Sequence, residues 1–408
     1  MRNINYSSKK AICSICVILA LWTLGAHAAT LPPDPDNAAL LYYQAFLLRP
    51  EPDEDTYWSI DEVVSGGEPD EKLIEYLNLR DCRKTIEFTE AAAQLPHCNW
   101  GIRFSQGFGS RLPQLVHFRP LMSLFYADAR VLAMDGDYRA ALGRCLTIRR
   151  FAGHVGMLNY AIALGTDMSA LRYIQNILGS MPPDAETLTW LRGQLAAVHS
   201  VIPSLARAVE MDLELVLQSW RNDPNDLLWL REQLAENDEG NDPEYFWSLT
   251  DEELLALIAT PYADFLNYAL RVIDSEMPYE EKYTELQRLI DELKDEFGSD
   301  PGTKLLVLPF APQVIEIYSL QVRHTTQFNA LKAAIEIYLA TANSGQLPET
   351  LPDYLPKDPF SGQDFEYEIT EKGFVLRCQA KDILASQAIW PPGTDSDVVH
   401  EYEFELQM

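Results

Sequence analysis

Positive charge is scarce in this sequence: 32 Lys and Arg face 61 Asp and Glu among 408 residues, which gives a formal net charge of −29. Binding to nucleic acid requires cations that release counterions from the phosphate backbone, and adsorption to anionic lipid requires similar cations. The composition therefore argues against nucleic acid as a partner. Cationic proteins and divalent metals stay open as companions, although a solvated acidic surface explains the charge by itself.

Cysteine is also sparse, and two of the six cysteines, Cys13 and Cys16, lie in an apolar N-terminal stretch where their C-x-x-C spacing is incidental. The other four are Cys82, Cys98, Cys145 and Cys378. An oxidising compartment could pair them, in any of three complete connectivities. We expect buried free thiols instead, because a helix between Cys82 and Cys98 would hold them beyond the roughly 7 Å Cα separation that a bridge allows.

Catalytic motifs are absent: the sequence has no G-x-S-x-G elbow, no H-E-x-x-H, no phosphate-binding loop and no G-x-G-x-x-G. His97 beside Cys98 lacks a second pair at metal-ligand spacing. His154, His199 and His324 are scattered over predicted helices, where a core or surface role is usual. Because runs of Asp and Glu are typical of hydrated faces, we assign no catalytic residue, no cofactor and no metal, and the sequence favours a protein that is not an enzyme.

The N-terminus has the pattern of a secretory signal. Three basic residues precede an apolar stretch, Ala11–Leu24, and Ala26 and Ala28 then match the A-x-A cleavage rule. We expect a cleaved signal peptide over residues 1–28, a linker over residues 29–36, and export to the periplasm or cell envelope. The alternative is a retained segment that anchors the chain in the inner membrane.

Helical periodicity dominates the rest of the chain and predicts a mainly α protein. We expect a multi-helix antiparallel domain over residues 37–310, followed by a long helix and a small β unit over residues 311–408. Residues 121–154 predict two helices joined at the Asp-Gly-Asp turn, which resembles a single tetratricopeptide-type hairpin. No second copy follows at a period near 34 residues, so a repeat array is not predicted.

Local signals predict several boundaries inside the helical region. Residues 37–50 have apolar side chains on nearly every side, which indicates a buried first helix. A helix break is expected near Asn78, and Thr250 with Glu253 forms a T-x-x-E capping box at the start of another helix. The Asn/Asp/Gly-rich stretch from residue 237 to residue 242 is the best candidate for a hinge.

The C-terminal region changes from helix to strand. Four prolines follow the last long helix, which we expect between Pro312 and Asn343. Alternating residues in "QDFEYEITEKGFVLRC" then predict a β-hairpin, with one set on one side of each strand: Phe365, Tyr367 and Ile369, then Phe374, Leu376 and Cys378. Because a lone hairpin is marginal in water, we expect it to pack on the last helix or gain a third strand from "VVHEYEFEL".

Two resemblances follow from these motifs. The run "ALKAAIEIYLATANSGQLPETLPDYLPKDPFSGQDFEYEITEKGFVL" is similar to the soluble end of type II secretion pseudopilins. Pseudopilins place this unit directly after a prepilin helix with a Gly-Phe processing site, which this N-terminus lacks, so pilus assembly is not implied. The calcium site of major pseudopilins would fall near Asp358 and Asp364, where we expect a solvated turn.

The larger resemblance is to a family of uncharacterised exported bacterial proteins that are mostly helical. It rests on "NAALLYYQAF", on "HCNWG" followed by "SQGFGS" and "LPQL", and on the C-terminal unit. It implies export and a helical fold, and it implies no activity.

The irregular segment over residues 97–119 is the best candidate for a binding site, because loops on a rigid scaffold usually carry binding groups. The candidate binding residues are Trp100, Arg103, Gln106, His117 and Arg119. They suit a pocket for an acidic or planar ligand. The alternative is a structural role, with Trp100 in the core and the arginines paired with the chain's own carboxylates.

Two functions are compatible with these features. The first is a noncatalytic binding or scaffold protein of the cell envelope whose partner is an envelope or secreted protein or peptide, with membrane contact only through an uncleaved signal segment. The alternative is a hydrolase-like enzyme with a pocket around residues 97–119. A pocket that joins His117 to a carboxylate would favour the enzyme, and a groove without titratable partners would favour the binding protein.

Overall fold

The structure, a computed structural model, describes residues 35–109, 112–156, 158–197, 202–237, 243–296, 306–382 and 399–406. Contacts divide the chain into Met1–Asp36 and Asn37–Met408, and the second unit is the one described below. The predicted signal segment over residues 1–28 and most of the linker over residues 29–36 lie outside the described residues. The division at residues 310/311 stays a prediction, as does the hinge after Asn237, whose residues 238–242 are also outside them.

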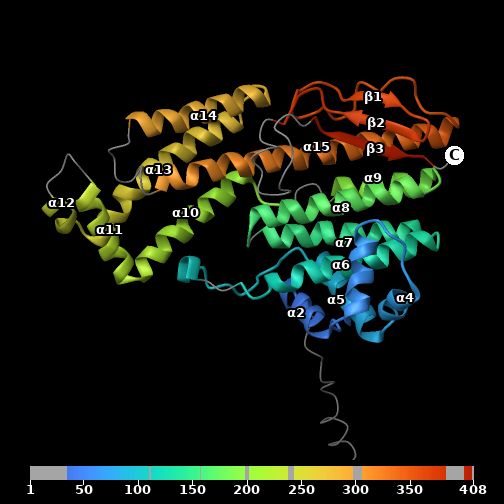
Figure 1. Cartoon of the computed structure of the whole chain (residues 1–408), viewed down its shortest axis with the longest axis horizontal. Helices are drawn as coiled ribbons and strands as arrows, with labels where there is room; N and C mark the ends of the chain where they lie inside the picture. Colours follow the sequence, from blue (N-terminus) through green and yellow to red (C-terminus); the bar gives the residue numbers. More distant parts are fainter. Residues whose placement is uncertain are drawn as a thin grey trace, which may run out of the picture. The chain divides into compact units, whose positions relative to one another are not determined.

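The described residues form a mainly α fold with a small antiparallel sheet near the C-terminus, which confirms the predicted fold class (Figure 1). The first elements are α2 (Ala38–Leu48), α3 (Glu54–Val64), α4 (Glu71–Leu77), α5 (Arg80–Gln94), the 3-10 helix η1 (Phe104–Gly109), α6 (Leu115–Met134), α7 (Tyr138–Gly156), α8 (Tyr160–Ser180) and α9 (Ala185–Ala197). They are followed by α10 (Leu205–Asn222), α11 (Pro224–Asn237), α12 (Pro243–Ser248), α13 (Asp251–Ile273), α14 (Tyr279–Glu296), α15 (Leu308–Ser344), β1 (Glu366–Ile369), β2 (Gly373–Arg377) and β3 (Glu401–Glu405).

Helix α2 is less buried than its composition predicts. Asn37 caps it by accepting a hydrogen bond from the Ala39 backbone N–H, and Tyr42 is fully buried. Leu40 and Leu47, however, are 49% and 87% exposed. Burial on nearly every side is therefore wrong, because α2 packs mainly against α5 and leaves its opposite face to solvent.

Helices α6 and α7 form the predicted hairpin, and α8 packs against α7 to continue the antiparallel layer. The turn between α6 and α7 places Gly136 at φ +81°, a conformation that glycine adopts without steric cost. Ala129 and Ala133 are buried at the helix interface, as small residues that permit close approach should be.

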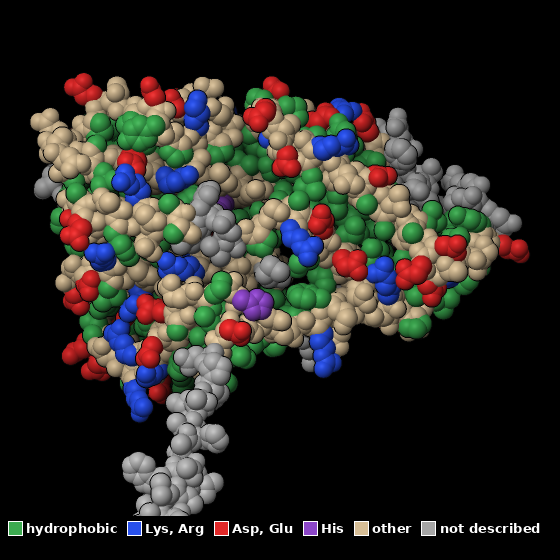
Figure 2. Space-filling view, turned by 180° about the vertical axis from the view of Figure 1, so that it is seen from behind, with side chains coloured by type: hydrophobic (Ala, Val, Ile, Leu, Met, Phe, Trp, Pro, Cys, Tyr) green, Lys and Arg blue, Asp and Glu red, His purple; other side chains and the backbone are tan. Residues whose placement is uncertain are grey.

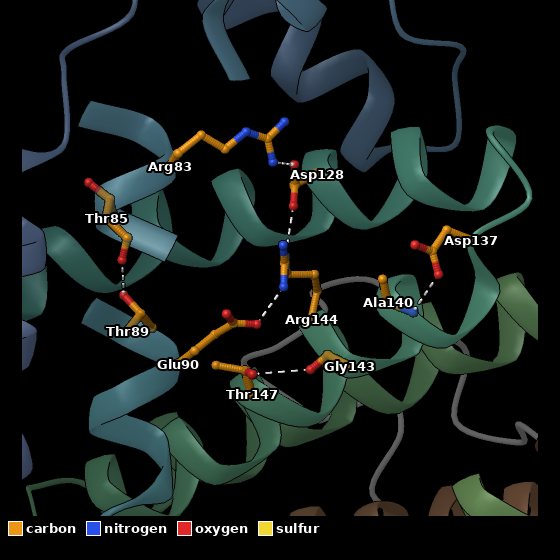
Figure 3. A network of polar contacts seen from close by, with 10 residues as sticks. All are labelled: Arg83, Thr85, Thr89, Glu90, Asp128, Asp137, Ala140, Gly143, Arg144 and Thr147. Atoms are coloured by element: carbon orange, nitrogen blue, oxygen red, sulfur yellow. Dashed lines mark hydrogen bonds and ion pairs between the residues drawn. The ribbon is translucent and has the colours of Figure 1, made fainter. Parts of the chain in front are cut away.

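A network of charges ties α5, α6 and α7 together (Figure 3). Asp128 is fully buried and accepts hydrogen bonds from Arg83 Nη1 at 2.6 Å and from Arg144 Nε at 2.7 Å. Arg144 also pairs with Glu90. Each oxygen of the buried carboxylate thus has a charged donor, which is the condition under which a buried charge is tolerated.

Other local predictions hold as well. Helix α4 ends at Asn78 and α5 starts at Arg80, which confirms the break, and Thr250 with Glu253 forms both halves of the capping box of α13. Cys82, Cys145 and Cys378 are buried free thiols, as expected, whereas Cys98 is a half-buried free thiol.

The C-terminal sheet has the order β1-β2-β3, so the expected third strand does come from the C-terminal segment. Figure 1 shows the sheet beside the C-terminal half of α15. Tyr338 of α15 contacts the rings of Phe374 and Phe404, which are partners in register, and its hydroxyl donates to the Glu405 carbonyl. This packing confirms that the hairpin rests on the last long helix.

The loop before β1 differs from its prediction. Asp358 is fully buried, and its carboxylate accepts from the backbone N–H groups of Phe360, Ser361 and Gln379. The Ser361 hydroxyl also donates to it. A solvated turn at Asp358 is therefore wrong, because the carboxylate serves as the internal acceptor that closes the loop.

Charge is distributed rather than concentrated on the face seen in Figure 2, where Lys and Arg side chains lie among Asp and Glu side chains. Within the described part of the chain, no helix has the length and apolar character needed to cross a membrane. The same residues contain no group of three or more His, Cys, Asp or Glu side chains suited to a metal ion.

Candidate functional site

Trp100 belongs to the core and also to a cleft. Its side chain is 5% exposed, and its indole Nε1 donates to the His154 carbonyl at 2.9 Å. The ring stacks on Tyr42 at a centroid distance of 5.4 Å and lies nearly parallel to Phe46 at 6.4 Å. Trp100 is thus a fixed surface rather than a mobile lid.

The histidine beneath Trp100 is fully hydrogen-bonded. His154 Nε2 lies 3.1 Å from the Leu95 carbonyl, which can only accept, so Nε2 carries the proton. His154 Nδ1 then accepts from the Tyr42 hydroxyl at 2.9 Å. Burial lowers the pKa of His154, which favours this neutral form and agrees with the predicted core role. His199 lies outside the described residues.

Three of the five predicted binding residues, Trp100, Arg103 and Gln106, line one cleft of about 830 Å3, which we call the Trp100 cleft. The remaining lining residues are Tyr43, Gly101, Ile102, Ser105, Pro113, Gln114 and Asn222. The volume falls within the roughly 300–1,000 Å3 of small-molecule and cofactor pockets.

The other two predicted residues, His117 and Arg119, belong to the first turns of α6 and do not line this cleft. His117 stacks on Phe46 at a centroid distance of 5.1 Å. The Arg119 side chain is 80% exposed, 4.0 Å from Asp61, and borders a separate hollow of about 150 Å3. The structure therefore does not unite His117 with the arginines, and the predicted five-residue pocket is wrong in this respect.

The wall of the Trp100 cleft is built by contacts between distant segments. The Tyr43 hydroxyl of α2 donates to the Trp100 carbonyl at 2.9 Å. The Asn222 side chain at the end of α10 donates to the Ser105 carbonyl of η1. Gly107 has φ +57°, and a Cβ there would overlap the backbone of Ser219, so only glycine lets η1 approach α10 this closely.

Gln114 is the unusual member of the cleft. It is 1% exposed, and neither its Oε1 nor its Nε2 has a hydrogen-bond partner among the described residues. Burying an amide without partners costs about 1–3 kcal/mol. Sequence reasoning missed Gln114, because a glutamine in "RLPQL" is typical of an exposed loop.

A second polar centre lies between α7, α8 and α15. Arg149 Nε donates to Asp167 Oδ1 at 2.6 Å and Arg149 Nη2 donates to Asp167 Oδ2 at 3.0 Å. His324 Nε2 lies 2.7 Å from the same Oδ2. Arg149 and Asp167 are only 4% and 3% exposed, so this is a buried bidentate ion pair with a histidine on its outer side.

The charge of Asp167 is held by its neighbours. Burial by itself raises the pKa of this carboxyl, but the positive charge of Arg149 and the hydrogen bonds from His324 and Arg149 outweigh burial and lower the pKa to about 2. Asp167 is therefore ionised at neutral pH, accepts from His324 Nε2, and holds Arg149 in place.

A cavity of about 240 Å3, which we call the Arg149 cavity, opens beside this centre. Its lining residues are Arg149, Tyr160, Leu164, Asp167, Ile202, Pro203, Ser204, Gln321, His324, Thr325, Phe328 and Asn329. Sequence reasoning assigned His324 to an ordinary helical role and missed the site, because its carboxylate partner lies 157 residues away. The available signal was a charged residue, Asp167, in the largely apolar run "IALGTDMSAL".

Comparisons with protein-family models, with curated proteins and with solved structures give no match to this chain.

Proposed function

We propose that this chain is an exported, noncatalytic binding or scaffold protein of the periplasm or cell envelope, and that it holds a protein or peptide partner in the Trp100 cleft. The alternative location is the inner-membrane surface, with the N-terminal apolar segment retained as an anchor. The N-terminal signal pattern and the motifs similar to exported helical proteins support export.

The chemistry of the cleft supports binding rather than catalysis. Among its described lining residues, Tyr43 and Arg103 are the titratable ones, and burial raises the pKa of Tyr43. The lining contains neither a carboxylate nor an imidazole, and His117 stacks on Phe46 instead. The hydrolase-like alternative needs a paired acid and base, which this lining does not provide.

The Gln114 amide indicates which kind of partner the cleft binds. Its free donor and free acceptor match the C=O and N–H of one residue in an extended peptide, because these two groups point to the same side of the chain and pair with a primary amide through two hydrogen bonds. Arg103 brings positive charge to the same cleft and favours an acidic side chain nearby. The aromatic surfaces of Tyr43 and Trp100 favour contact with the apolar parts of the segment.

The scaffold around the cleft is consistent with this role. We propose that the α6–α7 hairpin acts as a single tetratricopeptide-like unit, a helical form that binds protein partners when it is repeated. The unit formed by α15 and the sheet resembles the soluble end of pseudopilins, and we propose that it stiffens the protein rather than assembling a pilus.

The variant Gln114→Leu tests the proposal. Leu fills a similar volume without unpaired polar atoms, so we expect the free energy of unfolding to rise by about 1–2 kcal/mol while partner binding is lost. The matched control is Gln346→Leu, since Gln346 is exposed beyond the end of α15.

The measurement has two stages. Both variants and the wild-type chain are used to capture proteins from native envelope extract. A synthetic peptide from any protein that the wild type and Gln346→Leu retain is then titrated by fluorescence polarisation. Loss of the peptide signal in Gln114→Leu alone supports the proposal, and equal retention by all three chains contradicts it.

A further inference from the structure

The Arg149 cavity has a charged floor and an accessible rim. Arg149 and Asp167 are more than nine-tenths buried, whereas Ser204 is exposed and Gln321 and Asn329 are half-buried. A volume of about 240 Å3 corresponds to roughly eight water molecules at about 30 Å3 each. The space therefore suits a ligand of a few non-hydrogen atoms rather than a peptide or a nucleotide.

Two buried polar atoms of the cavity residues lack partners among the described residues. Asp167 occupies the Nε and Nη2 nitrogens of Arg149, and Arg149 Nη1 has no acceptor. Gln321 Oε1 has no donor. A ligand that satisfies both atoms must present an acceptor to the guanidinium and a donor to the amide oxygen.

The charges nearby favour an anion as the acceptor. Asp167 is the sole acidic residue among the described residues that line the cavity. The Arg149 guanidinium lies 4.5 Å from the centre of the Phe328 ring, and the Lys332 ammonium lies 4.6 Å from the same ring centre. Burial, and after it the positive charge of Arg149, lower the pKa of Lys332.

We propose that the Arg149 cavity binds a small carboxylic acid that carries a hydroxyl or amino group on the adjacent carbon, with the carboxylate on Arg149 Nη1 and the donor on Gln321 Oε1. The hydroxyl and amino forms share the same recognition chemistry. This site is separate from the Trp100 cleft. Variants of the Arg149 cavity therefore test acid binding without testing partner binding in the Trp100 cleft, and the reverse holds for variants of the cleft.

Isothermal titration of the full chain with four small probes tests the ligand class. L-lactate and L-alanine carry both groups, propionate lacks the donor, and L-alaninamide lacks the carboxylate. We expect L-lactate, L-alanine or both to bind, propionate to bind about tenfold more weakly because one hydrogen bond is missing, and L-alaninamide not to bind. Whichever of L-lactate and L-alanine binds more tightly shows whether the preferred donor is a hydroxyl or an amino group. No binding of either at about 1 mM, or equal binding of propionate, overturns the proposal.

Two variants locate the site. Gln321→Leu removes an unpaired oxygen without breaking a protein contact, so the affinity for the better acid should fall about tenfold, to that of propionate. Gln313→Leu, an exposed glutamine on the same helix, is the matched control and should bind as the wild type does. The paired variant Arg149→Met with Asp167→Met removes both charges together and should lose all carboxylate binding. Unchanged affinity in this folded pair contradicts the assignment.

Discussion

The substitution Asp167→Asn tests whether the buried ion pair beside the Arg149 cavity stabilises the fold. It keeps the shape of the side chain but leaves the guanidinium of Arg149, which is 4% exposed, without its countercharge. The pKa of Asp167 falls from its ordinary 3.8 to about 2. This difference corresponds to about 2.4 kcal/mol at about 1.36 kcal/mol per pKa unit. Breaking a buried pair costs about 3–5 kcal/mol, because an unpaired buried charge is added to the lost attraction. We therefore expect a loss of about 3 kcal/mol at pH 7.

The matched variant is the paired substitution Arg149→Met with Asp167→Met. It removes both charges and replaces them with apolar side chains, so its free energy of unfolding should stay within about 1 kcal/mol of the wild type. Urea denaturation of the full chains, followed by tryptophan fluorescence and by circular dichroism, measures each variant. We expect the losses in free energy of unfolding of the two single variants to add up to much more than the loss in the paired variant.

The effect has a defined pH dependence. Because the folded-state pKa of Asp167 is depressed, its stabilisation is fully present above the ordinary value of 3.8 and is lost as pH falls toward about 2. The stability gap between the wild type and Asp167→Asn should therefore narrow by about 2 kcal/mol between pH 5 and pH 2. A gap that is absent at pH 7, or that does not narrow in acid, refutes the ion-pair reasoning.

Three further substitutions test other contacts. Asp128→Asn should cost about 3 kcal/mol in urea denaturation, because it removes the fully buried negative charge that Arg83 and Arg144 share. Arg83→Ala should cost less because its side chain is 41% exposed, and equal losses would contradict this. Tyr338→Phe should lower the free energy of unfolding by about 1 kcal/mol and speed amide hydrogen exchange in β3, since it removes the hydroxyl that donates to that strand. Unchanged exchange in β3 would argue against this hydrogen bond. Gly107→Ala should separate η1 from α10 and abolish binding in the Trp100 cleft. The far-ultraviolet circular dichroism spectrum should stay unchanged. Wild-type binding by this variant would show that η1 does not form the wall of the cleft.

Local signals predicted much of the fold. The end of α4 at Asn78, the capping box at Thr250 and the turn at Gly136 each depend on a few neighbouring residues, so the sequence is sufficient to place them. The position of the small sheet on α15 was also predictable, because a hairpin with apolar faces needs a surface to cover. The exposure of Leu47 was not predictable in this way, since α2 is apolar all round and periodicity does not choose its buried face.

The candidate sites depend on contacts that sequence spacing does not reveal. Trp100, Arg103 and Gln106 meet because they share one irregular segment, whereas His117 lies in α6, which begins at Leu115, and stacks on Phe46 instead. The Arg149 cavity needs three helices, and His324 of the third lies 157 residues from Asp167 along the chain. Its residues have ordinary helical surroundings in the sequence, and only tertiary packing brings a guanidinium, a carboxylate and an imidazole within hydrogen-bonding distance.

The buried polar groups differ in whether the described residues complete their hydrogen bonds. Asp128 has both oxygens paired with arginines, and the network is complete within the chain. Gln114 and Arg149, by contrast, each bury a hydrogen-bonding atom without a partner among the described residues. An apolar side chain at Gln114 or Gln321 would relieve that cost, so the folded state alone gives no reason for these polar side chains. A ligand that supplies the missing hydrogen-bond partners does give a reason for them. An apolar substitution at Gln114 or Gln321 should then raise the stability of the fold and weaken ligand binding, whereas a substitution at Asp128 should only lower the stability.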